Sequence, residues 1–489
     1  MSTAINNVSF NSYELEVLSL VNNEGEAFDI KGNFIECVIT ESISVHWLSG
    51  EIFIADLYGF LERAKLTGQE SLRIRYRQPA GIGATADEVD TIDQIFRIYS
   101  ITHSDRVDHS ASVHKLSFIS PEGFEAMRTR ISTAFRGNLS DLIAKVSEEY
   151  LGIQNQPTEK KLVPHFELRK KSEGDNFHVV IPNWTIDYTI EWLCENAQAT
   201  DSQKGIEESF FFFQTANGGY RVQSLSDMYK LKYLNGDSFI YSRAHVNDPK
   251  TNPWDEGKTG MGRRIIDYIQ GNVSDTLGGT ISGLFSSNQT TINNTFKYHV
   301  TKSYDYLERF YGSGESINEF PLVRQGDITL YVADEASDNS KVPVTSPYMT
   351  FKPINSYKDA CRFLTSDSSY VHDINNNIVQ SNFGAHLGGG QFRQAAKLLL
   401  GYSTIQCLLP ARTDISCGQI INLDILPAGV YNEDEEVRFH SGDYLITSVQ
   451  WSLTRSECNT NITAMKDSVP NRFETAKVDY DGSIKYVSG

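Results

Sequence analysis

Basic side chains are scarce in this 489-residue chain, which has 44 Lys and Arg residues against 62 Asp and Glu residues and a net charge of -18. A surface that wraps nucleic acid needs clustered Lys and Arg to neutralise phosphates and release their counterions. The composition therefore excludes stable DNA or RNA binding over the average surface. It is compatible with a channel through which DNA slides without sticking, although solubility through self-repulsion is the simpler explanation.

Cysteine is also rare, and its positions are scattered. No Cys-x-x-Cys pair occurs and no His stands at ligand spacing, so the pattern predicts no metal site. Several of these cysteines lie in apolar runs, where they are typical of small buried hydrophobes in a reducing cytosol. The six are Cys37, Cys194, Cys361, Cys407, Cys417 and Cys458.

Long apolar runs are missing. No stretch approaches the ~20 apolar residues of a membrane-spanning helix, and Met1–Phe10 lacks the basic and apolar regions of a secretory signal. We expect neither export by that route nor stable membrane insertion.

Motifs of catalysis are absent as well: we find no nucleophile elbow, phosphate loop, zinc-binding His pair or glycosidase-like pair of carboxylates. Gly388–Gly390 could hold an anion before a helix, but a simple cap is the stronger interpretation. Asp373–Asn377 has oxygen ligands at calcium-loop spacing without the required Gly and Glu. His46, His103 and His109 are interpreted as ordinary sheet or loop residues. The sequence predicts no catalytic residue, no cofactor and no metal, and hence no enzyme.

What the chain does contain is a composition with 40% hydrophobic and 22% charged residues, enough to bury several cores. Its first third predicts an antiparallel sheet, because apolar and basic residues alternate strictly along Leu72–Arg77. The acidic stretch Asp87–Asp93 is expected to be part of a loop. Further strands are predicted from β-branched and aromatic runs at Phe34–Ser44, Glu51–Tyr58, Ile95–His103 and Val113–Ser120.

The middle of the chain has a different period. Helices are predicted over Leu139–Tyr150 and Trp184–Leu193, followed by a buried hairpin over Phe210–Val222. Gly271–Thr295 is rich in Gly, Ser, Thr and Asn, and we expect a mobile or partner-ordered loop there. Phe296–Phe383 is expected to be a mixed, irregular insertion. A short helix from Gln391 to Gly401 follows it.

Strands then return in the order of the first third, which suggests two copies of one β-domain or a chance repeat in a β-rich chain. Gly68–Ile74, Phe96–Ser100 and His114–Phe118 correspond to Gly418–Leu423, Tyr444–Ser448 and Asn461–Met465. The predicted structural core residues of the two copies are Leu72, Ile74, Tyr76 and Ile98, and Ile421, Leu423 and Ile446.

In order more than in identity, the sequence resembles the baseplate hub proteins of contractile-tailed, T-even-like phages. The resemblance covers most of the chain. Its similar stretches are Leu116–Ile143, Ile181–Thr185, Phe210–Val222, Ile265–Gly271, Gly401–Cys407, Ile415–Ile421 and Tyr444–Trp451. The chain departs from the family by being longer in Gly271–Phe383 and Val430–His440, so contacts there are not carried over.

The resemblance implies an α+β, mainly β fold with two tail-tube-like antiparallel β-barrel or sandwich domains, a helical connector and an inserted mixed domain. The expected division is 1–125 for the first tube-like domain, 126–237 for the connector, 238–290 with 400–470 for the second, discontinuous tube-like domain, 291–399 for the insertion and 471–489 for a C-terminal tail.

The implied function is structural: a homotrimeric ring of pseudo-six-fold symmetry that joins a trimeric central spike to a hexameric tail tube and lets DNA pass. The implied partners are the spike, tail-tube or tube-initiator proteins, baseplate wedge proteins and a tape-measure protein, with DNA only in transit. The implied location is the virion, after assembly in the cytoplasm of the bacterial host. Two alternatives stay open: a hub of a type VI secretion or tailocin machine, and a hub fused to a cell-wall hydrolase within Phe296–Phe383.

Overall fold

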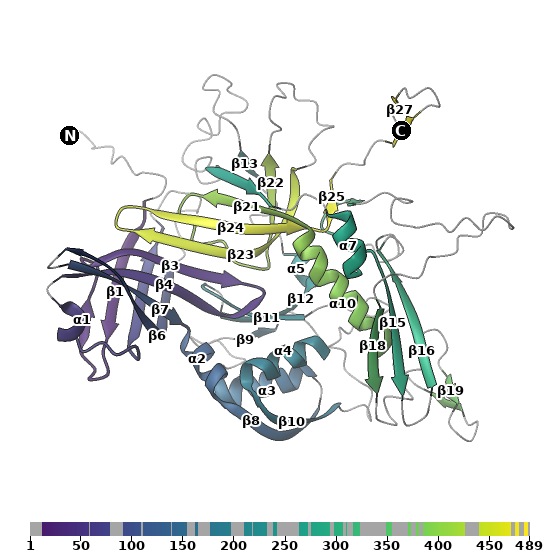
Figure 1. Cartoon of the computed structure of the whole chain (residues 1–489), viewed down its shortest axis with the longest axis horizontal. Helices are drawn as coiled ribbons and strands as arrows, with labels where there is room; N and C mark the ends of the chain where they lie inside the picture. The colour runs from purple at the N-terminus through teal and green to yellow at the C-terminus, as the bar shows by residue number, and fades with distance from the viewer. Residues whose placement is uncertain are drawn as a thin grey trace.

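The computed structural model in Figure 1 has one large sheet of 13 strands, with a helical layer beneath it. It describes residues 12–57, 59–78, 91–108, 111–137, 139–153, 162–164, 177–196, 210–217, 219–231, 238–241, 264–271, 275–293, 298–306, 310, 316–322, 349–354, 370–372, 378–380, 385–425, 440–470, 475–478 and 484–487.

The main sheet has 13 strands in the order β14-β21-β24-β23-β3-β4-β7-β6-β5-β1-β2, with β13 and β22 branching from β23. The mainly β class expected from the sequence is confirmed. Its N-terminal elements are β1 (Glu14–Val21), β2 (Ala27–Asp29), β3 (Phe34–Ser42), β4 (Val45–Leu57), the one-turn helix α1 (Phe60–Arg63), β5 (Ser71–Arg77), β6 (Thr91–Asp108) and β7 (Ala111–Ile119). Its later strands are β13 (Ser238–Tyr241), β14 (Asp267–Gln270), β21 (Ser403–Leu409), β22 (Ile420–Ile425), β23 (Gly442–Thr454) and β24 (Cys458–Lys466).

The same strand order occurs twice in this sheet. In what we call the first strand set, the neighbours run β3-β4-β7-β6-β5, and every pair is antiparallel. In the second strand set they run β14-β21-β24-β23-β22, again with antiparallel pairs only. The two sets differ at the next strand, because β1 is antiparallel to β5 whereas β13 is parallel to β22.

The turn that leads into β5 also recurs before β22. The backbone N–H of Ile98 donates to the carbonyl of Glu70, and that of Ile446 donates to the carbonyl of Gln419, each at 2.9 Å. A left-handed glycine lies two residues before the first acceptor, Gly68 with φ 90, and one residue before the second, Gly418 with φ 78, a conformation that glycine adopts without steric cost. The likeness of the two sets therefore extends from strand order to local hydrogen bonding.

A connector layer lies below the first strand set (Figure 1). The expected hairpin is present, because β11 and β12 pair from Phe210 to Ser224. The second helix begins later than expected, at Ile186, since Trp184 and Thr185 still pair with β8 as part of β10. The elements are α2 (Pro121–Arg128), β8 (Arg130–Gly137), α3 (Leu139–Leu151), β9 (Leu162–Pro164), β10 (Phe177–Thr185), α4 (Ile186–Asn196), β11 (Phe210–Thr215), β12 (Gly219–Ser224) and α5 (Leu225–Tyr229).

The expectation of a loop over Gly271–Thr295 is wrong for most of its length, because α7 (Thr276–Ser282) and β15 (Ser286–Asn293) occupy it. Asp275 caps α7 by accepting the Gly278 N–H at 2.8 Å, and Gly283 with φ 85 ends it. The capping residues at both ends therefore stabilise a helix in a segment whose composition favours a loop.

β15 pairs with β16 (Tyr298–Asp305) and β18 (Met349–Ile354) beside α10 (Ala385–Tyr402). Gly388–Gly390 lies inside α10, not before it as expected. Each helical glycine costs about 1 kcal/mol relative to alanine. The C-terminal part of α10 offsets this by burying Ala395, Leu399 and Tyr402 in a separate core with Leu284, Phe285 and Tyr306.

Three short strand pairs complete the described structure: β17 (Phe320–Pro321) with β25 (Ser468–Val469), β19 (Tyr370–His372) with β20 (Ile378–Gln380), and β26 (Thr475–Val478) with β27 (Ile484–Val487). Thr91–Asp93, expected to be loop, begins β6. Asp373–Asn377 and residues 430–439 of the longer Val430–His440 segment lie outside the described residues. Within the described part of the chain, no helix combines the length and the apolar character needed to cross a bilayer.

Candidate assembly interface

The two strand sets are joined edge to edge by β3 and β23, a junction that we call the seam. β3 pairs antiparallel with the second half of β23, from Ser42 opposite Ser448 to Glu36 opposite Thr454. β22 pairs with the same side of β23, but only along its first half, residues 442–445. Because β23 is long enough to hold one partner after the other, the two sets form one continuous sheet.

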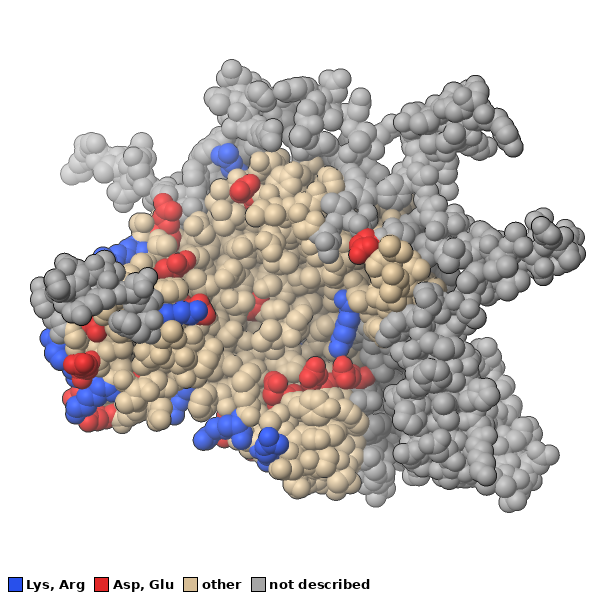
Figure 2. All heavy atoms as spheres, in the orientation of Figure 1, with Lys and Arg blue, Asp and Glu red and all other residues tan. Residues whose placement is uncertain are grey.

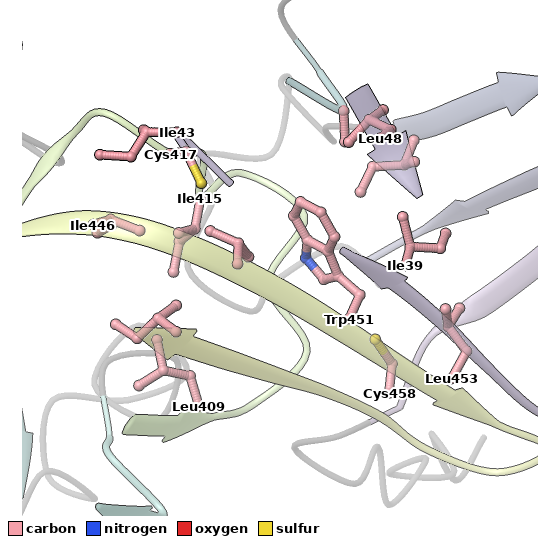
Figure 3. Close-up of a cluster of buried hydrophobic side chains, with 14 of the residues drawn as sticks. Ile39, Ile43, Leu48, Leu409, Ile415, Cys417, Ile446, Trp451, Leu453 and Cys458 are labelled. Atoms are coloured by element: carbon pink, nitrogen blue, oxygen red, sulfur yellow. The ribbon is translucent and has the colours of Figure 1, made fainter. Parts of the chain in front are cut away.

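Trp451 anchors the apolar side of the seam. It is fully buried opposite Ile39, and its indole Nε1 donates to the carbonyl of Arg412 at 2.7 Å. Figure 3 shows the indole close to Ile39 of the first set and Leu453 of the second. Both sets contribute to the same core cluster, so the seam is packed like a domain interior.

Polar contacts fix the register at the end of the seam. Ser452 Oγ donates to Glu36 Oε1 at 2.7 Å across the strand pair. Just beyond β23, the guanidinium of Arg455 donates to the carbonyls of Phe34 and Gly32 at 2.9 and 2.8 Å. These bonds satisfy carbonyls where the ladder ends.

Glu41 is a buried carboxylate at the other end of the seam. Its side chain is 1% exposed and accepts the backbone N–H of Cys417 at 2.6 Å and that of Ala216 at 2.8 Å. Burial raises the pKa of Glu41 to about 7, although the two N–H donors and the nearby Arg221 act in the opposite direction. One ionisable group thus ties β3 to the connector hairpin and to the turn before β22.

The first strand set is also held to the connector by polar bonds. His46 Nδ1 lies 2.8 Å from Asp187 Oδ1, and Trp47 Nε1 donates to the same oxygen at 2.7 Å. Burial opposes the charge of Asp187, but these two partners hold its pKa below the usual value. The arrangement fixes β4 against the first turn of α4.

The outward side of β5 carries three arginines in ion pairs with neighbouring strands. Arg73 and Asp93 lie 2.9 Å apart, Arg75 and Glu16 lie 2.7 Å apart, and Arg77 pairs with Glu14. We call these pairs the arginine ladder. The arginine side chains keep 42–46% of their surface exposed, so solvent screens the pairs. Figure 2 shows basic and acidic atoms close together at this end of the molecule and few over the middle of the same face.

The seven predicted core residues all lie in the cluster that spans both strand sets, each with at most 1% of its surface exposed. Strand pairing makes several of them equivalent. Leu72 stands opposite Phe96 as Ile421 stands opposite Tyr444. The seven are Leu72, Ile74, Tyr76, Ile98, Ile421, Leu423 and Ile446.

Sequence reasoning missed Glu41 and Trp451. Glu41 carried a usable signal, because it follows Cys37 and Ile39 at alternate positions and so faces the core side of β3. A carboxylate on the buried side of a strand requires compensating donors, which come here from residues far away in the sequence. The described residues also contain no group of three or more His, Cys, Asp or Glu side chains placed to hold a metal ion.

No protein-family model matches the sequence, and no curated protein is similar to it. Among solved structures, the chain is similar to a tail protein from Neisseria meningitidis MC58 at 11% identity and a TM-score of 0.47, covering 94% of this chain and 98% of that one. It is similar to the 43 kDa tail protein of prophage MuSo2 from Shewanella oneidensis at 9% identity and a TM-score of 0.47, covering 94% and 100%. It is also similar to a Francisella PdpA-VgrG complex at 12% identity and a TM-score of 0.43, covering 99% and 55%.

Proposed function

We propose that this protein is the structural hub subunit of a contractile phage baseplate, acting as a homotrimer without enzymatic activity. Each chain supplies two tube-like β-domains, formed around the first and second strand sets, and three chains make a ring of six quasi-equivalent units. The ring joins a trimeric central spike to a hexameric tail tube.

The observation that carries this proposal is the repeat of one strand order within a single sheet. A chain with two equivalent units, joined by an unsymmetrical edge contact, can continue the same contact to the next chain. Such contacts close into a ring when the rotation between units divides a full turn. A three-fold ring with two units per chain matches a trimer on one side and a hexamer on the other.

The proposed partners are those that the resemblance to hub proteins implies. The spike and the tail-tube or tube-initiator proteins bind the two faces of the ring, and baseplate wedge proteins bind its rim. DNA and the tape-measure protein meet the subunit only in transit through the channel, and a net charge of -18 disfavours their retention. The site of action is the virion baseplate, after assembly in the host cytoplasm.

The test is the mass and symmetry of the purified full-length chain, alone and with its spike partner. Light scattering should give three times the 55.0 kDa mass of the chain, and electron microscopy should show a three-fold ring with a channel and six similar units. A chain that stays monomeric with and without the spike contradicts the proposal. A ring without DNA passage would instead support the secretion-machine alternative.

A further inference from the structure

We infer that β14 of one chain pairs antiparallel with the second half of β6 in a neighbouring copy, repeating between chains the seam that β3 and β23 form within one. This rests on the proposed function, because it names the contact by which copies of the chain assemble. It gives a partner both to β14 and to the second half of β6.

The strand order supplies the equivalence. β3 is the outer strand of the first set and β14 is the outer strand of the second. β3 pairs with β4, which pairs with β7, and β14 pairs with β21, which pairs with β24. Likewise, β6 and β23 are the long strands that pair with β5 and β22 along their first halves. The seam therefore joins an outer strand of one set to a long strand of the other.

A shared irregularity fixes the register. β6 slips by one residue against β7 between Ile98 and Ser100, and β23 slips against β24 between Ile446 and Ser448. Ser448 thus corresponds to Ser100, and Ser452 corresponds to Ser104 when counted along the strands. On the outer strands, pairing with β4 and β21 makes Ile269 the counterpart of Val38.

Both expected partners are open in the described structure. Among the described strands, β14 pairs only with β21, and β6 pairs only with β7 beyond Arg97. On β14 the side chain of Ile269 is 64% exposed, whereas its counterpart Val38, covered by the seam, is partly buried. An edge strand offers unpaired backbone N–H and C=O groups to which another strand can add.

The chemistry of the seam can be repeated at the new contact. Ser452 stands opposite Val38 and donates to Glu36, two residues earlier on β3. In the neighbouring copy, Ser104 would stand opposite Ile269. Asp267 lies two residues before Ile269, as Glu36 lies two residues before Val38, and offers the same carboxylate. The Asp267 carboxylate now accepts the N–H of Tyr268 at 2.9 Å, a local bond that assembly can exchange.

Disulfide trapping in the full chain tests this register. Cysteines that face each other across an antiparallel pair lie within bonding distance, whereas diagonal positions are too far apart. The double variant Ile269→Cys with Ser104→Cys should give oxidant-dependent dimer and trimer bands on a non-reducing gel, several-fold above each single variant. The misregistered pair Ile269→Cys with Thr102→Cys should give few such bands.

A matched internal control is Val38→Cys with Ser452→Cys, which should link within one chain without raising its mass. Each variant is also checked by thermal melting and light scattering. If the chain is trimeric but cysteines at 269 and 104 link no better than the misregistered pair, the proposed strand pairing is wrong. The ring of the proposed function is not contradicted by that result. A chain that remains monomeric both alone and with the spike overturns both proposals.

Discussion

The second half of β23 is covered by β3, whereas the equivalent half of β6 pairs only with β7 among the described strands. The covered half, Ser448–Thr454, contains the apolar residues Val449, Trp451 and Leu453, whereas the equivalent Ser100–Arg106 has one apolar residue, Ile101. A permanent contact within one chain can be dry, but an edge that meets water before assembly must resist unwanted pairing. In the proposed ring, the covered apolar edge would serve folding and the open polar edge would serve assembly.

The largest loss of unfolding free energy should come from removing the buried side chain of Trp451 at the seam. Trp451→Ala removes a fully buried indole and its bond to Arg412, and losses of this kind cost about 3–5 kcal/mol of unfolding free energy. Denaturant unfolding of the subunit measures it. Tyr99→Ala on β6 is the control, because Tyr99 is 53% exposed and its loss should cost far less. Equal losses for both variants would mean that the seam contributes no more than a surface position.

Substitutions at matched positions test whether the cores of the two strand sets are equivalent. Ile74 and Leu423 occupy the same place in their sets, and both are fully buried. Ile74→Asn and Leu423→Asn should each cost on the order of 2–5 kcal/mol, because each buries an unpaired amide in place of a large apolar group. Melting temperatures of the two variants should fall by similar amounts. A harmless Ile74→Asn would show that the first core is not organised like the second.

Glu41 should make the seam sensitive to pH. Its folded-state pKa is raised from 4.5 to about 7, so its stabilising contribution is complete below pH 4.5 and is lost as the pH rises through about 7. The difference in melting temperature between the wild type and Glu41→Gln should therefore change between these two values and be constant above them. Using a difference cancels the titration of other groups. A difference that does not vary with pH would place the ionisation of Glu41 outside this range.

The strands of both sets could be predicted because their apolar residues alternate, as along Leu72–Arg77 and Ile421–Ile425. The seam could not, since it joins Glu36–Ser42 to a strand more than 400 residues later, and strand partners are not encoded by local period. α7 was missed because a cap at Asp275 outweighs loop-like composition. Glu41 is a similar case. The sequence places it on the buried side of β3, but it does not reveal that the N–H groups of Ala216 and Cys417 donate to it.

The smallest effect is expected on the arginine ladder, which the second strand set does not share, because Asp424 of β22 stands where Arg75 stands in β5. Arg75→Gln should change the unfolding free energy by no more than about 0.5 kcal/mol, since its pair with Glu16 is exposed and screened. Its melting temperature should match the wild type, while that of Ile74→Asn falls. Light scattering on the same samples detects any contact that this face makes with another subunit. A variant that melts normally but forms fewer trimers would place the ladder at an interface. An Arg75→Gln that unfolds more easily than Ile74→Asn would show that charged pairs, not the buried alternation, hold β5 in the sheet.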